Sequence, residues 1–110
     1  MLTPVAIFIS LILYPAPILT PPQLLTQAGI EAGWNRPEIR CAFEIVRLES
    51  RWDYQAKNKH SSARGLFQIL NTRETASIQD QIEAGIKYFQ HRFNNNPCQA
   101  LEHHRRWGWY

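Results

Sequence analysis

Charged side chains are missing from the first part of this sequence. Residues 1–30 contain no Asp, Glu, Lys or Arg, so all twelve basic and all nine acidic residues of the 110-residue chain follow Ile30. The net charge of +3 and the hydrophobic fraction of 45% are typical of a globular domain, and the length leaves no room for a second one. The sequence therefore predicts an uncharged leader over residues 1–20 and one domain over residues 21–110.

The leader lacks the length of a membrane-spanning helix. Its apolar run over residues 4–14 is shorter than the roughly 20 residues that a spanning helix needs, and Pro15 and Pro17 interrupt it. The run has the length of the apolar part of a secretory signal peptide, although residues 1–3 carry no basic side chain and no clear cleavage site follows. Two interpretations stay open: a signal peptide, or an N-terminal anchor that packs on the domain or enters a membrane.

Patterns typical of β-strands are missing as well. No alternating run of β-branched residues is bounded by Asn-Gly or Asp-Gly, whereas helix capping patterns recur. We therefore predict a mostly α domain with four helices. The first begins after Thr20 and ends at Gly29, a residue type that often ends helices. The second begins after Asn35 and has an apolar stripe that leads to Glu49.

The second half of the domain contains the other two predicted helices. Ser77 caps the longer one, whose apolar residues keep helical spacing as far as Phe93. The run Asn94-Asn95-Asn96-Pro97 ends this helix and caps the fourth, which ends near Trp107. The polar residues 52–72, between the second and third helices, predict a structured loop with one helical turn over residues 66–70.

The sequence has only two cysteines, Cys41 and Cys98. A disulfide between them would stabilise a small exported domain by roughly 4 kcal/mol, because it closes a long loop in the unfolded chain. The alternative is two reduced thiols buried in the core helices of a cytoplasmic protein.

Glu49 is the first candidate for chemistry. It continues the apolar stripe of the second helix and lies at the C-terminal end of that helix, and both features raise the pKa of a carboxyl group. A carboxyl group with a raised pKa can donate a proton at neutral pH, as cleavage of a glycosidic bond requires. By position alone, a surface Glu paired with Arg47 or Arg51 is the more frequent case.

The residues around Glu49 resemble the soluble lytic transglycosylase-like family, which has a goose-lysozyme-like fold. The resemblance covers most of residues 22–110 and is closest to small actinobacterial and phage members. It rests on motifs that follow in order: Glu49-Ser50 before Trp52, Ala56-x-Asn58, Gly65-Leu66-Phe67-Gln68-Ile69, Gln81-x-x-x-Gly85-x-x-Tyr88, and Gly108-Trp109-Tyr110.

The resemblance implies a lysozyme-like helical domain that cleaves the β-1,4 bond between N-acetylmuramic acid and N-acetylglucosamine in peptidoglycan. Glu49 would act first as general acid and then as general base. Ser50, Asn58, Gln68 and Tyr88 would bind the substrate, although Ser50 could instead bond a helix-end carbonyl and Tyr88 could simply pack in the core. Gly65 and Gly85 are expected to permit close packing.

Some polar residues are expected to have structural roles. Asp53 fits a salt bridge or an Asx-type turn better than activation of a water molecule, and Asp80 fits a helix cap. The family's Ala-Tyr-Asn-x-Gly motif is missing from the last helix, where this chain has Ala100-Leu101-Glu102-His103-His104-Arg105-Arg106. His103, His104 or Trp107 could replace the aromatic residue of that motif in contacting a sugar, or the contact could be omitted. Adjacent histidines on a helix point about 100° apart, so we expect no metal site there, and a solvated basic face is the default expectation for His103 and His104.

Two other function classes compete with the transglycosylase. One keeps the same site but releases a hydrolytic product, as a muramidase does, or only binds peptidoglycan without cleaving it. Nucleic-acid binding through the Arg-rich and Trp-rich C-terminus ranks low, because the charge excess is three and no nucleic-acid motif is present. We expect an exported or virion-associated monomer that needs no cofactor, binds the peptidoglycan glycan strand and touches a membrane only through its leader.

Overall fold

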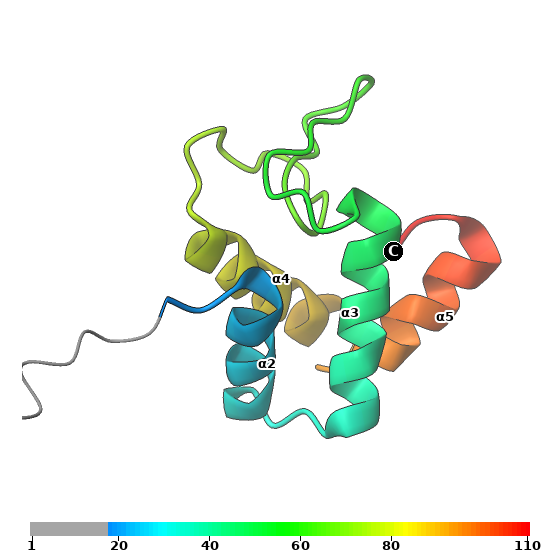
Figure 1. Cartoon of the computed structure of the whole chain (residues 1–110). Helices are drawn as coiled ribbons and strands as arrows, with labels where there is room; N and C mark the ends of the chain where they lie inside the picture. Colours follow the sequence, from blue (N-terminus) through cyan, green and yellow to red (C-terminus); the bar gives the residue numbers. More distant parts are fainter. Residues whose placement is uncertain (1–17) are drawn as a thin grey trace, which may run out of the picture.

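The computed structural model of this chain describes residues 18–110, so most of the predicted leader lies outside the described residues. The described part contains α2 (Pro21–Glu31), α3 (Arg36–Ser50), α4 (Ile78–Arg92) and α5 (Pro97–Trp107), and no named β-strand. Figure 1 shows the helices gathered into one body, with the loop over residues 51–77 extending past the C-terminal end of α3. The predicted mostly α fold is confirmed.

The four predicted N-terminal caps are confirmed. Thr20, Asn35 and Ser77 each form a capping box, in which the side chain accepts a hydrogen bond from the third helical N–H and the side chain three residues later bonds back. Asn96 caps α5, where its Oδ1 accepts a hydrogen bond from the N–H of Cys98. Local sequence therefore determined where each helix begins.

The predicted end of the first helix is wrong. Helix α2 continues through Gly29 to Glu31, and the left-handed glycine of this turn is Gly33, with φ of 86°. Gly29 is buried inside the helix, and a Cβ atom there would lie 2.6 Å from a ring carbon of Trp34. This glycine therefore permits close packing of Trp34 on α2 rather than ending the helix.

The predicted helical turn over residues 66–70 is also wrong. The chain instead forms turns, with Arg64 in isolated antiparallel bridges to Lys57 and Ile69. Gly65 and Gln68 have positive φ values of 81° and 50°, which a right-handed helical turn excludes. The structured loop predicted between the second and third helices is otherwise present.

A disulfide joins α3 to α5 and confirms the predicted pairing of Cys41 with Cys98. Both cysteines lie nearer the N-terminal ends of their helices, and Figure 1 shows the two helices running in the same direction. The disulfide is compatible with an exported protein. In residues 18–110, no helix combines the length and the apolar character needed to cross a bilayer.

The core lies where the helices meet the loop. Helix α2 packs against α3 and α4, and α3 packs against α5. Phe67 from the loop inserts beside Phe89 of α4, with 5.9 Å between the ring centroids. The largest fully buried side chains are Phe67, Phe89, Leu25, Ile45, Leu66, Val46 and Pro97. The loop is thus part of the core and is fixed relative to the end of α3.

Candidate functional site

Glu49 is partly buried at the end of α3, as its position in the apolar stripe predicted. Its side chain is 17% exposed, and its Oε1 lies 2.7 Å from Nε2 of His104 on α5. Burial raises the pKa of Glu49, while the hydrogen bond and the charge of His104 act in the opposite direction. The net direction is upward, so the structure places a partly buried carboxyl group with a raised pKa between two helices that are joined by a disulfide.

The expectation of a solvated face for His103 and His104 is wrong, because both rings are half-buried. His104 contacts Glu49, and its ring centroid lies 6.3 Å from that of Tyr110. His103 packs edge-on against Trp109, with 4.6 Å between the ring centroids. The sequence did not indicate the pair of His104 with Glu49, since the two residues lie on different helices 55 positions apart.

Ser50 follows Glu49 but points into the protein. Its hydroxyl group lies 2.8 Å from the carbonyl oxygen of Leu66 and 3.1 Å from that of Val46, and the residue is 9% exposed. The hydroxyl group therefore connects the end of α3 to the loop, which favours the helix-end role over contact with a substrate.

Gln81, on α4, connects the loop to that helix, as Ser50 connects it to α3. Its Oε1 accepts a hydrogen bond from the N–H of Leu66, and its Nε2 donates to the carbonyl oxygens of Tyr54 and Ala76. A Cβ atom on Gly65 would clash with Oε1 of Gln81. One on Gly85 would lie 2.6 Å from the ring of Phe67. The close packing predicted for both glycines is confirmed.

Gln68 and Tyr88, two predicted substrate-binding residues, line the same pocket of about 400 Å³. Its other lining residues are Ile69, Leu70, Arg92, Trp109 and Tyr110. The amide of Gln68 donates to the carbonyl oxygens of Ala56 and Gly65, and the hydroxyl group of Tyr88 donates to the main-chain oxygen of Tyr110. Both donors are therefore engaged in fixing the pocket wall.

Tyr110 lines this pocket and lies close enough to Glu49 for the charge of Glu49 to affect it. Its ring is 9% exposed, its hydroxyl group donates to the carbonyl oxygen of Phe67, and its centroid lies 5.2 Å from that of Tyr88. Burial raises the pKa of Tyr110 well above its usual value, and the negative charge of Glu49 adds to this effect. The C-terminal tyrosine is therefore a neutral wall that both the pocket and Glu49 share.

Two other polar residues of the loop are used in turns. Oδ1 of Asn58 accepts a hydrogen bond from the N–H of His60, on an exposed part of the loop. Oδ1 of Asp53 likewise accepts from the N–H of Gln55, which confirms the Asx-type turn. The structure therefore brings Glu49, Gln68 and Tyr88 around Tyr110 and leaves Asn58 in a turn.

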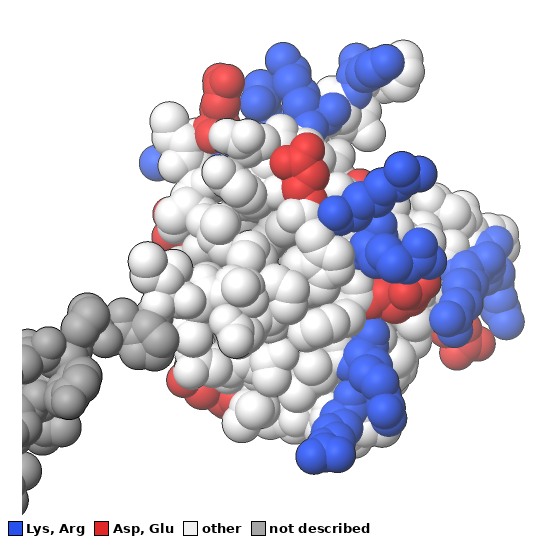
Figure 2. Space-filling model, in the orientation of Figure 1, with Lys and Arg blue, Asp and Glu red and all other residues white. Residues whose placement is uncertain are grey.

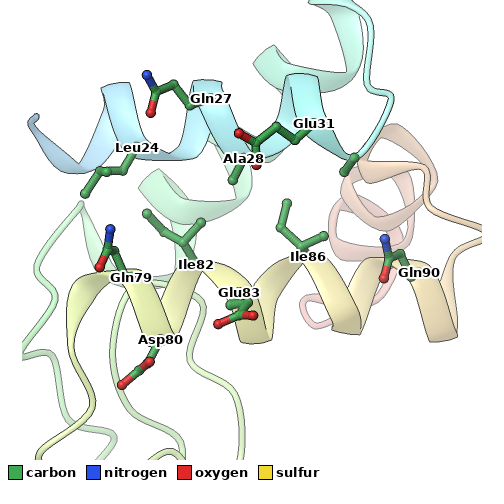
Figure 3. Close-up of a pocket in the computed structure, with 11 residues that line it drawn as sticks. Leu24, Gln27, Ala28, Glu31, Gln79, Asp80, Ile82, Glu83, Ile86 and Gln90 are labelled. Carbon is green, nitrogen blue, oxygen red and sulfur yellow. The ribbon is translucent and has the colours of Figure 1, made fainter.

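A larger pocket, of about 560 Å³, lies between α2 and α4. Figure 3 shows Ile82 and Ile86 of α4 pointing toward Leu24 and Ala28 of α2, while Asp80 points away. Asp80 belongs to the capping box of α4, as predicted. Glu83, also in the lining, is exposed, so this pocket offers volume without a buried acid or base.

No group of three or more His, Cys, Asp or Glu side chains suited to a metal ion is present within residues 18–110. Comparison with known proteins adds no assignment: the chain matches no protein-family model, no curated protein and no solved structure. The chemistry of the site must therefore be inferred from its own residues.

Proposed function

We propose that this domain cleaves the β-1,4 bond between N-acetylmuramic acid and N-acetylglucosamine in peptidoglycan, as a lytic transglycosylase. The observation that carries the proposal is the partly buried carboxyl group of Glu49, whose pKa is raised by burial at the end of α3. Glu49 also begins the ordered motifs that resemble the lytic transglycosylase-like family. A single carboxyl group is enough for this reaction, because the substrate supplies its own nucleophile.

In the first step, the protonated carboxyl group of Glu49 donates its proton to the glycosidic oxygen as the bond from that oxygen to C1 of the muramic residue breaks. In the second step, the resulting carboxylate removes the proton from the 6-hydroxyl group of the same sugar. The 6-oxygen then forms a bond to C1 and closes a 1,6-anhydro ring. Glu49 ends in its initial protonated form, and no water molecule is consumed.

His104 positions the acid in this mechanism. Its Nε2 contacts Oε1 of Glu49, which leaves Oε2 as the carboxyl atom available to the substrate. The charge and hydrogen bond of His104 lower the pKa that burial raises, and both keep the carboxylate stable after it has released its proton. The disulfide between Cys41 and Cys98 supports this contact by joining the two helices that carry the pair.

The pocket beside Tyr110 is the candidate region for the glycan strand. Trp109 is 53% exposed at its edge, and an exposed indole can pack against the apolar face of a sugar ring. Gln68 and Tyr88 keep the wall of this pocket in place through bonds to backbone carbonyls. We infer that the protein acts as a monomer outside the cytoplasm, or from a virion, where peptidoglycan is accessible.

The test is mass spectrometry of the fragments that the full chain releases from purified peptidoglycan. The Glu49→Gln variant is the comparison, because it keeps the shape of the side chain but has no acidic proton. Glu83→Gln is the matched control, since it removes an exposed carboxyl group from α4.

Anhydro-muramic fragments that disappear in the Glu49→Gln variant and persist in the control would support the proposal. Fragments with reducing ends would make the protein a hydrolytic muramidase. If the wild-type chain released nothing but bound the glycan, the domain would be a peptidoglycan-binding module and the proposal would be wrong.

A further inference from the structure

Arginine side chains form a row along one side of α3. Each residue of an α-helix turns by about 100°, so Arg36, Arg40 and Arg47 lie within about 40° of one another around the helix. Arg51, which caps the C-terminal end, continues the row. All four residues are exposed. With a rise of about 1.5 Å per residue, the row is about 22 Å long.

Most of these guanidinium groups have no protein counter-ion. Arg47 pairs with Glu44 in the same helix. Within residues 18–110, no carboxylate lies within 4.0 Å of the side-chain nitrogens of Arg36, Arg40 or Arg51. Unpaired arginines at neighbouring helical positions repel one another, and this repulsion is relieved when an anion binds.

Helix α5 adds positive charge to the same side of the molecule. The hydrogen bond from Arg47 lowers the pKa of Glu44, and the charge of Arg105 on α5 contributes to that decrease, so Arg105 lies on the same side of the molecule as Glu44. On the face that Figure 2 shows, Lys and Arg side chains lie over α3 and α5 and also over the loop, and acidic side chains lie among those over α3 and α5. The arginine row is therefore one of the positively charged parts of this face.

We propose that this arginine row binds a linear polymer of phosphate groups. The planar guanidinium group presents paired N–H donors that match the oxygens of a phosphate. The row is one side chain wide and several side chains long, which fits a chain of anions better than a single small anion or a flat lipid surface.

This function is separate from the proposed cleavage of peptidoglycan. Glu49 lies about 180° around α3 from Arg40, because the two residues are nine helical positions apart. A polymer held by the row therefore leaves the carboxyl group of Glu49 free. Binding would keep the protein on a phosphate-rich part of the cell envelope and would leave Glu49, at the C-terminal end of α3, available to the glycan.

The test is the affinity of the full chain for end-labelled inorganic polyphosphate, measured by fluorescence anisotropy at several salt concentrations. The test variant is Arg36→Gln/Arg40→Gln. The matched control is Arg73→Gln/Lys87→Gln, which removes two exposed positive charges from the loop and α4. Both variants change the net charge from +3 by the same amount.

We expect the row variant to bind roughly tenfold more weakly at low salt and its slope of log affinity against log salt to fall by roughly 1.4, or about 0.7 for each lost phosphate contact. The control should keep the wild-type slope. Equal losses in the two variants would mean that only net charge matters and would overturn the proposal.

Binding of two further ligands tests which kind of phosphate compound the arginine row recognises. Single-stranded DNA with the same number of phosphates should bind with similar affinity, and the row variant should lose both ligands together. DNA binding that the row variant retains would place that binding elsewhere and contradict the proposal. Binding to phosphatidylglycerol vesicles without binding to polyphosphate would identify a lipid surface and also contradict it. The Glu49→Gln variant should bind as the wild type does, whatever its cleavage activity.

Discussion

The domain contains two pairs of packed helices that differ in how they are held together and in what they expose. The α3–α5 pair has a disulfide, the Glu49–His104 contact and the arginine row. The α2–α4 pair has no disulfide, and a pocket of about 560 Å³ lies along it. The larger pocket therefore lies on the pair without the candidate acid, while the partly buried carboxyl group of Glu49 lies on the other pair.

This difference shows why pocket volume alone does not locate a site. Glu31 and Glu83, in the lining of the α2–α4 pocket, are exposed, and water stabilises their charge. The carboxyl group of Glu49 is partly shielded from water and contacts one partner, His104. Partial burial of this kind raises the pKa of a carboxyl group and is frequent at sites of proton transfer. We therefore expect substitutions in the two pairs to have different consequences.

The largest expected effect is on catalysis. Glu49→Gln should reduce the release of peptidoglycan fragments by roughly 10²- to 10⁴-fold, the usual contribution of a general acid. Glu83→Gln, in the α2–α4 pair, should stay within about twofold, because exposed carboxylates contribute little. Initial rates on purified peptidoglycan measure both. Equal losses in the two variants would remove the distinction between the pairs.

The next effect is on stability. Cys41→Ala/Cys98→Ala should lower the free energy of unfolding by roughly 4 kcal/mol, because it removes a link between residues 57 positions apart. Urea unfolding measures the change. The wild-type protein in reductant should match the variant, and reductant should not affect the variant further. A loss below about 1 kcal/mol would show that packing alone holds α3 to α5.

A smaller loss is expected where the α2–α4 pair meets the loop. In Gly85→Ala, the added Cβ atom would lie 2.6 Å from the ring of Phe67. We expect a loss of about 1–3 kcal/mol from this overpacking, despite the higher helix propensity of Ala. Gln90→Ala on the exposed side of α4 should change stability by less than about 0.5 kcal/mol. A stabilised Gly85→Ala protein would show that the ring can move.

The smallest expected effect is on the pKa of Glu49, and it tests the role of His104. Its hydrogen bond and charge lower the pKa of Glu49 against the effect of burial, so His104→Leu should raise that pKa further. Loss of activity at high pH should then occur at a higher pH, because the acid stays protonated longer. His104→Gln, which can still donate a hydrogen bond, should shift the pKa less.

The carboxyl titration of Glu49, followed by ¹³C NMR, measures this pKa without relying on activity. A downward shift in His104→Leu would contradict the assigned roles of burial and His104.

Much of the fold could be predicted from local sequence. The capping residues Thr20, Asn35 and Ser77 identified three helix starts, because a cap needs only residues within one turn. The end of α2 was missed, since the role of Gly29 depends on Trp34, which packs on it. The turns around Gln68 were missed for a similar reason: Gln81 and Ser50 hold the loop from two helices.

The candidate site was only partly predictable. The apolar stripe of α3 indicated that Glu49 would be partly buried, because helical spacing sets which side of a helix faces the core. The partner was not indicated, since His104 follows from the packing of α3 on α5. The two cysteines are the one signal that could have indicated this pair. If a disulfide joins two parallel helices at Cys41 and Cys98, residues about two turns after each cysteine can contact each other.

The sequence by itself determined the helix starts, the single pair of cysteines, the partly buried position of Glu49 and the row of arginines along α3. These depend on spacing and on residues close in the chain. The tertiary structure alone decided that His104 contacts Glu49, that Tyr110 lines a pocket with Gln68 and Tyr88, and that Ser50 points inward. Those contacts require helices from distant parts of the chain to pack, and no local pattern fixes the distance between them.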